Sequence, residues 1–186
     1  MKIAISSSSN DLIDENYKKI ARNVTKYLAE QGHDLIWGSG SSSIMGICYE
    51  EFSKQKRNIY GFTSEKYVDD IENLPLATHK VEKDTFDLKK VMFENADAVL
   101  FLAGGTGTVS EFFTDLEEVR SNDRNKALIA YNEDHSFDMI LALIKDLISK
   151  NFNSTSIYDY FKVANNLDEL KTILESLGKK ENHKVK

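Results

Sequence analysis

Apolar residues fall into two alternating patterns along this chain. Short runs rich in Ile, Val, Leu and Phe separate longer segments in which apolar residues recur every three or four positions. The short runs are typical of strands buried on both faces, and the longer period is typical of helices that pack on a core. Their alternation predicts an α/β fold in which a central parallel sheet carries helices on both faces.

Seven runs are strand candidates. They cover residues 2–6, 34–38, 58–62, 77–81, 98–102, 126–131 and 160–164. Helical stripes are expected over residues 17–28, 84–95, 109–121, 136–150 and 167–177. We find no internal repeat and no linker, so we expect one domain over residues 1–178. The polar residues 179–186 have nothing to bury and are expected to form a disordered tail.

Composition and charge narrow the possible partners. The chain has 186 residues and a formal net charge of −6, and 30 acidic residues outnumber 24 lysines and arginines. We therefore expect neither nucleic acid nor a membrane surface among its partners. The single cysteine, Cys48, rules out an internal disulfide, and the first residues lack the apolar run of a signal peptide. We expect a cytoplasmic protein, because no apolar segment approaches the roughly 20 residues that span a bilayer.

Small residues follow three of the predicted strands. The loops read SSSSND after the first strand, GSGSSSIMG after the second and AGGTGT after the fifth. In an open parallel sheet, the loops at the carboxyl ends of the strands meet at one edge, where ligands bind. One such loop alone is explained as well by an ordinary turn. Three together predict a crevice lined with hydroxyl and backbone N–H groups, which suits a nucleotide phosphate.

The third loop leads into a helix and carries the most specific pattern. Its three glycines allow backbone angles closed to other residues and a close approach of a phosphate, and its threonines offer hydroxyl groups. The helix expected to begin near Gly107 directs unpaired N–H groups and a partial positive charge at such an anion. The spacing is neither the GxGxxG of dinucleotide-binding proteins nor the GK[ST] of a P-loop. We interpret the loop as an anion cradle.

Acidic residues follow the cradle at helical spacing. Glu111, Asp115 and Glu118 share one face of the predicted helix, and we expect Asp115 and Glu118 to be solvated. Glu111 lies one turn from Thr108 and could reach a sugar whose phosphate sits in the cradle. The alternative for Glu111 is a carboxylate that caps the helix start.

The motif A-G-G-T-G-T-V-S-E, residues 103–111, resembles the PGGxGTxxE signature of the LONELY GUY family. Members of that family are cytokinin riboside 5'-monophosphate phosphoribohydrolases, often labelled lysine decarboxylases. GSGSSSIMG, residues 38–46, is similar to the family's GGGxxGLMG, and ISSSS, residues 5–9, is similar to its first-strand exit. The resemblance covers nearly the whole chain. It implies a Rossmann-like homodimer that binds AMP-like nucleotides and cleaves the bond between the base and ribose 5-phosphate.

The loops and the resemblance together give one set of candidate site residues. Glu111 is the candidate catalytic carboxylate, because a carboxylate can stabilise the positive charge that develops on the ribose as the base departs. Lys89, or less favourably Lys90, would neutralise phosphate or support the leaving group. The candidate phosphate-binding residues are Ser7, Ser8, Gly40, Met45, Gly46, Gly104, Gly105, Thr106, Gly107 and Thr108.

Several positions depart from the family pattern. Ala103 stands at the motif's proline, Ser110 at an acid, and Ser39 and Ser43 at glycines. The family's arginine falls on Leu88, or on Lys89 if the register shifts by one residue, and a lysine lacks the bidentate fork of a guanidinium. One hypothesis is therefore a nucleoside 5'-monophosphate hydrolase. The other is a binding or carrier protein for a nucleotide or a phosphorylated cofactor such as molybdenum cofactor, without turnover.

The remaining reactive side chains indicate no metal and no cofactor. His33, His79, His135 and His183 have no ligand spacing and are expected at the surface. Cys48 lies in an apolar pattern, so we expect a small buried residue rather than a nucleophile. No feature of a pyridoxal phosphate enzyme supports the label lysine decarboxylase.

Overall fold

The computed structural model describes residues 1–122 and 126–184, without the side chains of residues 69, 70 and 179–184. Seven parallel strands form one sheet in the order β4-β3-β2-β1-β5-β6-β7. They are β1 Lys2–Ser6, β2 Asp34–Trp37, β3 Ile59–Ser64, β4 Thr78–Glu82, β5 Ala98–Phe101, β6 Ala127–Tyr131 and β7 Lys162–Ala164. All seven predicted strands are confirmed, with ends that differ by two residues at most. Burial on both faces is wrong for β4, which lies at the edge of the sheet and is largely exposed.

Helices connect the strands. They are α1 Glu15–Glu30, α2 Ser43–Lys54, η1 Glu65–Asn73, α3 Thr85–Asn95, α4 Thr106–Ser121, α5 Asp138–Ser149, η2 Thr155–Asp159 and α6 Leu167–Lys184. The apolar pattern does not predict α2, because this helix is buried on several sides and shows no clear apolar stripe. The domain boundary at residue 178 and the disordered tail stay predictions. The helix α6 continues to Lys184, and residues 185–186 lie outside the described chain. None of the described helices has the length and apolar character needed to cross a membrane.

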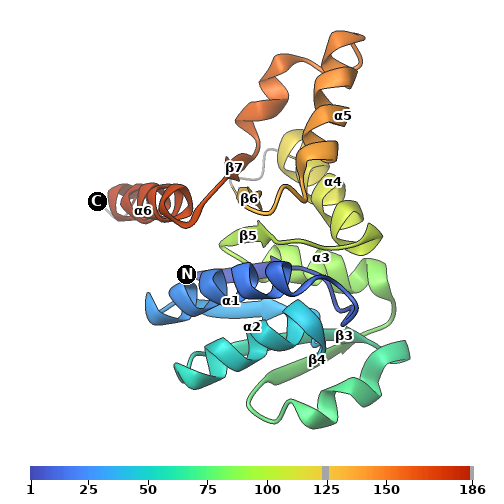
Figure 1. The fold of residues 1–186 in the computed structure, drawn as a ribbon, viewed down its shortest axis with the longest axis vertical. Coiled ribbons are helices and arrows are strands. Elements are labelled where there is room, and N and C mark those ends of the chain that lie inside the picture. Colours follow the sequence, from blue (N-terminus) through green and yellow to red (C-terminus); the bar gives the residue numbers. More distant parts are fainter. Residues whose placement is uncertain (123–125, 185–186) are drawn as a thin grey trace.

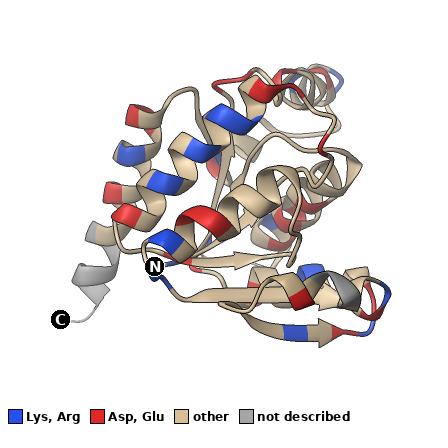
Figure 2. Cartoon of the chain, turned by 60° about the horizontal axis from the view of Figure 1, so that its bottom comes forward, with Lys and Arg blue, Asp and Glu red and all other residues tan. Residues whose placement is uncertain are grey.

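Two apolar clusters confirm that helices cover both faces of the sheet (Figure 1). One cluster packs α1, α2 and α6 on the sheet and includes Leu28 and Phe52. The other packs α3, α4 and α5 on the opposite face and centres on Phe112, whose ring lies 5.3 Å from that of Phe101 at an interplanar angle of 82°. The fold is therefore a single Rossmann-like α/β domain. In the view of Figure 2, positions of Lys and Arg and positions of Asp and Glu both occur on several of the described helices.

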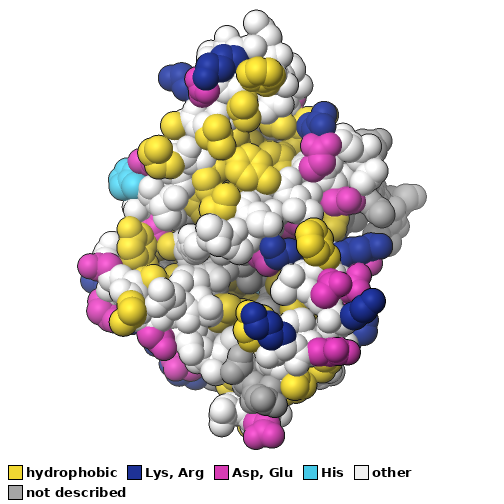
Figure 3. Space-filling model, turned by 90° about the vertical axis from the view of Figure 1, so that its right-hand side faces the viewer, with side chains coloured by type: hydrophobic (Ala, Val, Ile, Leu, Met, Phe, Trp, Pro, Cys, Tyr) yellow, Lys and Arg dark blue, Asp and Glu magenta, His cyan; other side chains and the backbone are white. Residues whose placement is uncertain are grey.

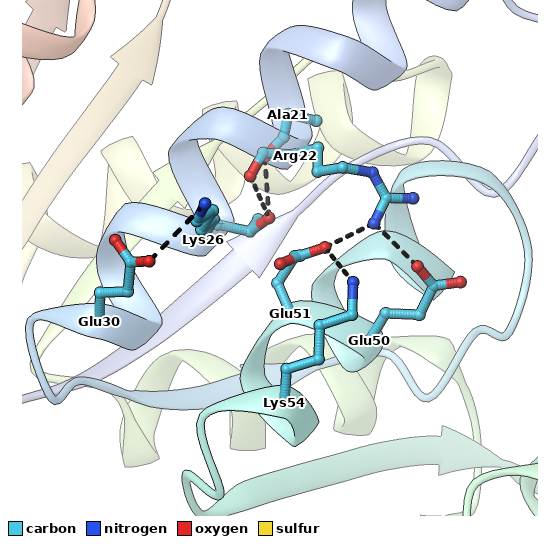
Figure 4. A network of polar contacts seen from close by, with 8 residues as sticks. Ala21, Arg22, Lys26, Glu30, Glu50, Glu51 and Lys54 are labelled. Carbon is cyan, nitrogen blue, oxygen red and sulfur yellow. Dashed lines mark hydrogen bonds and ion pairs between the residues drawn. The ribbon is translucent and has the colours of Figure 1, made fainter.

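A polar network joins α1 to α2 (Figure 4). Arg22 donates hydrogen bonds to Glu50, at 2.9 Å, and to Glu51, while Lys54 donates to Glu51 at 2.7 Å. Glu51 is buried, which would raise the pKa of its carboxyl, but the hydrogen bonds from Lys54 and Arg22 outweigh burial and hold that pKa below its ordinary value. The buried acid of α2 is therefore paired on both sides.

The strand order reverses between β1 and β5. From β1 the chain builds outward to β4, then crosses back to β5 on the other side of β1. The loops after these two strands meet, because the Ser8 N–H group donates to the Ala103 carbonyl oxygen at 3.0 Å. Both loops lie on the right of Figure 1. Ligands of open α/β sheets bind at such a reversal, so the site is sought there.

Candidate functional site

The start of α4 is open. The helix begins at Thr106, one residue before the predicted start, and no side chain caps its first turn. Residues 104–107 are exposed. The first N–H groups of a helix have no partner within it and carry a partial positive charge. The position after β5 therefore offers backbone donors to an anion, as the motif predicts.

The glycines before α4 act differently from our expectation. Gly104, Gly105 and Gly107 do not have a positive φ, so the prediction of backbone angles closed to other residues is wrong. A Cβ on Gly104 would lie 2.0 Å from Oγ1 of the buried Thr108, so glycine is required there by packing. A Cβ on Gly105 or Gly107 would meet nothing within 4 Å. These two glycines leave space at the helix start.

Glu111 lies one turn inside α4, against the end of β1. Its carboxylate accepts a hydrogen bond from the Ser6 hydroxyl group. Burial raises the pKa of Glu111, and the Ser6 hydrogen bond and the Lys89 ammonium oppose that rise. The alternative role as a capping carboxylate is wrong, because the first turn of α4 contains no acidic residue. Ser6 was missed, although a polar residue that ends a buried strand at the sheet reversal could have indicated it.

Lys89 and Leu88 of α3 have different surroundings. The Lys89 ammonium donates to Oγ of Ser110 at 3.1 Å, and Lys89 lines a small inner pocket together with Ser6 and Glu111. Leu88 instead packs against the apolar cluster of α3, α4 and α5. The position matched to the family's arginine therefore faces the core, and the cation beside Glu111 is Lys89.

Asp115 contradicts our prediction of a solvated side chain. It is only 6% exposed, because the i, i+4 spacing turns it inward beside Glu111, and Glu118 is half-buried. Burial, with the nearby Glu111 charge, raises the pKa of Asp115 to about 8, although the Lys126 and Lys89 ammonium groups oppose the rise.

A cleft of about 400 Å³ lies between α3 and α4. Phe86 and Phe93 contribute apolar walls, and Lys89 and Asp115 contribute charged groups. Lys89, Phe93 and Asp115 also line the inner pocket that holds Glu111, so the two spaces adjoin. Lys90 lines only the outer cleft. The volume of the cleft between α3 and α4 lies in the range of small-molecule sites.

The glycine-rich loop after β2 is closed. The Asp11 carboxylate accepts a hydrogen bond from the Ser43 N–H group at 2.7 Å, and the Ser8 carbonyl oxygen accepts one from the Met45 N–H group at 3.2 Å. A Cβ on Gly40 would lie 2.8 Å from the Met45 sulfur, and one on Gly46 would lie 2.3 Å from a backbone oxygen, so packing explains both glycines. Phosphate binding by these residues, and by the half-buried Ser7, stays a prediction.

Cysteine and histidine side chains lie outside this arrangement. Cys48 is buried, as predicted, and burial raises the pKa of its thiol to about 12. His135 is exposed, but surface positions are wrong for the half-buried His33 and His79. Burial lowers the pKa of His33 to about 4, and both ring nitrogens of His79 have hydrogen-bond partners. The side chain of His183 lies outside the described part. Among described side chains, no group of three or more His, Cys, Asp or Glu could hold a metal ion.

Two solved structures share this fold. The molybdenum cofactor carrier protein of Chlamydomonas reinhardtii superposes with a TM-score of 0.66 at 14% identity, covering 95% of this chain and 96% of that chain. The molybdenum cofactor binding protein of Rippkaea orientalis gives a TM-score of 0.65 at 16% identity, with the same coverage of 95% and 96%. At such identities the likeness shows the fold alone.

Sequence comparison identifies the family. A probable cytokinin riboside 5'-monophosphate phosphoribohydrolase of Oryza sativa subsp. japonica is 27% identical over 160 residues, which cover 86% of this chain and 70% of that protein. The cytokinin riboside 5'-monophosphate phosphoribohydrolase of Mycobacterium marinum is 26% identical over 156 residues, which cover 81% of each protein. A family model described as possible lysine decarboxylase matches residues 45–174. The chain therefore belongs to this family, the LONELY GUY family.

Proposed function

We propose that this chain hydrolyses the N-glycosidic bond of nucleoside 5'-monophosphates of the AMP or cytokinin riboside type, releasing the free base and ribose 5-phosphate. The observation that carries the proposal is the uncapped start of α4, followed one turn later by the Glu111 carboxylate. Family membership and the names of the relatives support the same reaction. A substrate of this class also fits the cytoplasmic location expected from the sequence.

In this proposal, phosphate at the α4 start places the ribose beside Glu111. Departure of the base develops positive charge on the ribose ring, and a nearby carboxylate stabilises that charge and positions the attacking water. The Ser6 hydroxyl group orients the Glu111 carboxylate through its hydrogen bond. Lys89 places a positive charge beside Glu111, which favours the charged form of the carboxylate.

Release of free base tests the proposal. AMP and a cytokinin riboside 5'-monophosphate are incubated with the protein, and free base and ribose 5-phosphate are quantified by chromatography. Adenosine is the matched control, because it lacks only the phosphate. We expect its kcat/KM to be lower by about a hundredfold or more, since binding energy from the phosphate is lost. If no nucleoside 5'-monophosphate releases its free base, the proposal is contradicted.

Binding of a nucleotide or phosphorylated cofactor without turnover is the second candidate. Leu88 favours it, because this side chain packs on the core where the family's arginine is expected and Lys89 supplies only an ammonium group. Calorimetric titration distinguishes the two candidates. Saturable AMP binding without base release would favour the second.

We also propose a homodimer, as the family resemblance implies. Met139 of α5 is 80% exposed and Phe152, just beyond α5, is 75% exposed. Leu143 and Tyr158 are exposed nearby in the chain. Figure 3 shows hydrophobic side chains gathered over the end of the molecule that α5 forms in Figure 1. Exposed apolar patches mark interaction surfaces. A mass in solution near twice 21.2 kDa would support the dimer, and a monomer would contradict it.

A further inference from the structure

Asp115 is a buried acid at the centre of the site. It lies one helical turn beyond Glu111 on α4 and lines both the inner pocket and the outer cleft. It is 6% exposed, and the Lys126 and Lys89 ammonium groups act on its carboxyl group. Burying a charged carboxylate is costly even near cations, so such a group is kept neutral or meets a ligand. Its place in the lining of both spaces points to a ligand.

The order of groups along α4 matches the order of groups in a nucleoside 5'-monophosphate. A helix rises about 1.5 Å per residue, so Glu111 lies about 7.5 Å and Asp115 about 13.5 Å along the axis from Thr106. Phosphate at the open helix start would place the ribose near Glu111 and the base near Asp115. Phe86, which is 82% exposed, and Phe93 form aromatic walls of the cleft there. Aromatic walls suit a flat heterocyclic base.

The charged groups around Asp115 differ from those around Glu111, and the difference favours a different role for each carboxyl group. The charged groups that face Asp115 or line its cleft are Glu111 and Glu118 of α4, Asp87, Lys89, Lys90 and Glu94 of α3, and Lys126 ahead of β6. Burial and the two acids of α4 raise the pKa of Asp115 to about 8, against the opposing lysines. Burial also raises the pKa of Glu111, but the Ser6 hydrogen bond and the Lys89 ammonium group oppose that rise and favour the charged form of Glu111. Neighbouring carboxyls whose surroundings push their pKa values apart form an acid and base pair.

We propose that Asp115 is a second catalytic residue, a general acid that protonates the departing base while Glu111 acts on the ribose and the water. This inference rests on the proposed function. The bond between C1' and the base nitrogen breaks, its electron pair stays with the base, and Asp115 gives the base a proton. The water oxygen bonds to C1', and the water's proton goes to Glu111. A proton then returns from Glu111 to Asp115 across one turn, so each turnover consumes one water molecule.

Two substrates that differ in the need for an acid test this role. AMP requires protonation of its leaving base, whereas 4-nitrophenyl β-ribofuranoside 5-phosphate releases a stable phenolate without it. We expect Asp115→Asn to lower kcat/KM for AMP by about a hundredfold and to leave the nitrophenyl substrate within about threefold of wild type. Glu111→Gln should slow both substrates. In the wild type, kcat/KM for AMP should fall as pH rises through about 8, and Asp115→Asn should lack this fall.

Other outcomes separate the two proposals. Equal slowing of both substrates by Asp115→Asn, or an unchanged pH profile, would overturn the role of Asp115 while leaving the proposed function in place. A wild type that cleaves neither substrate would remove the proposed function and this role with it. Asp115→Glu, which keeps an acid, should recover part of the AMP activity. Glu117→Gln on the exposed side of α4 is the matched control and should behave as wild type, and circular dichroism checks that each variant folds.

Discussion

The helices α2 and α4 both follow glycine-rich loops at the same edge of the sheet, but only α4 has an open start. The first N–H groups of α2 donate to the Asp11 carboxylate and the Ser8 carbonyl oxygen. The first turn of α4 has no side-chain cap. Asp11 therefore occupies at α2 the position that a phosphate could take at α4. Glycine-rich sequence marks both loops equally, and only the polar partners distinguish them.

The helices α2 and α4 each contain a buried acid, and the two acids have different polar surroundings. Glu51 of α2 is 5% exposed and Asp115 of α4 is 6% exposed. Arg22 and Lys54 donate hydrogen bonds to Glu51 and hold its pKa below the ordinary value, whereas burial raises the pKa of Asp115 to about 8. Buried polar groups are normally satisfied, and the exceptions concentrate where the protein has a function to perform. The comparison supports the proposal that α4 carries the function, and it suggests the hypothesis that α2 forms a structural half of the edge.

The largest expected effect comes from removing the charge of Glu111. Glu111→Gln keeps the size of the side chain, so the fold should survive, but stabilisation of the positive ribose is lost. We expect kcat/KM for AMP to fall by on the order of a hundredfold or more. Steady-state kinetics measure the fall, and Glu51→Gln on α2 is the control for loss of a buried acid. Equal activity of Glu111→Gln and wild type would show that the acid of α4 is structural too.

The two buried acids should give opposite dependences of stability on pH. The folded-state pKa of Asp115, about 8, lies above its unfolded value, so its contribution is full below the unfolded pKa and is lost as pH rises through 8. Asp115→Asn should therefore be more stable than wild type at pH 9, by on the order of 5 kcal/mol, and the gain should vanish toward pH 4. Urea unfolding at pH 4, 7 and 9 measures this difference.

Glu51 has the opposite sign. Its folded-state pKa is lowered, so its contribution is present above the unfolded pKa and is lost as pH falls through the folded pKa. Glu51→Gln should lower the free energy of unfolding at pH 7 by about 1 to 2 kcal/mol, because Arg22 and Lys54 lose a charged partner. The loss should shrink in acid. Parallel pH profiles for Glu51→Gln and Asp115→Asn would remove the contrast between the two acids.

A carboxylate placed at the start of α4 should weaken the binding of an anion there. Thr106→Asp places a carboxylate at the first residue of α4. At α2 the Asp11 carboxylate, which comes from the loop after β1, accepts a hydrogen bond from the first N–H group. We expect AMP binding to weaken by about tenfold or more through charge repulsion, while stability rises by about 0.3 kcal/mol or more. Thr106→Asn is the neutral control and should bind AMP close to wild type. Unchanged affinity of the aspartate variant in calorimetry would place the phosphate elsewhere.

Opening the start of α2 should cost stability and create no new site. Asp11→Ala leaves the Ser43 N–H group without its carboxylate partner, so we expect the free energy of unfolding to fall by about 1 kcal/mol. Asp11→Asn, which keeps an oxygen acceptor, should lose less. Denaturant unfolding measures both variants. A gain of AMP binding capacity in Asp11→Ala would contradict the assignment of α2 to the structural half.

The fold could be read from the sequence because its signals are local. The spacing of apolar residues and the composition of the short runs predicted every strand and the loops at the carboxyl ends of the strands. The helix α2 was missed because Ile44, Cys48, Glu51 and Phe52 are all buried and blur its stripe. Glycine content also misled, since φ at residues 104–107 is ordinary and packing against Thr108 explains Gly104.

The site could be predicted only in part, since its remaining features depend on tertiary placement. The motif indicated Glu111 and the open helix start. The contact of Ser6 with Glu111 joins residues 105 positions apart, and that of Asp11 with Ser43 joins residues 32 positions apart. The burial of Asp115 depends on residues of α3, such as Phe93, that line the same spaces. No local pattern decides these contacts, so sequence could not tell which glycine-rich loop is closed.

The smallest expected effect concerns Ser39 and Ser43, the serines that replace family glycines in the loop after β2 and at the first residue of α2. Ser39 and Ser43 have φ values of 54° and 53°, in the left-handed region that favours glycine. The Ser39 hydroxyl group is hydrogen-bonded with Nδ1 of His79 at 3.1 Å, whereas the buried Ser43 hydroxyl group has no partner among the described residues. Ser43→Gly removes backbone strain and an unsatisfied polar group together, so it should raise the free energy of unfolding by about 0.5 to 1 kcal/mol.

Ser39→Gly should gain less, because relief of strain is offset by loss of the hydrogen bond to His79. Ser42→Gly is the control, since its φ of −105° carries no such strain and the substitution only adds freedom to the unfolded chain. Thermal and urea unfolding should therefore rank the three variants with Ser43→Gly as the most stable. A larger gain for Ser39→Gly than for Ser43→Gly would mean that strain in the closed loop is not relieved where the unpartnered hydroxyl lies.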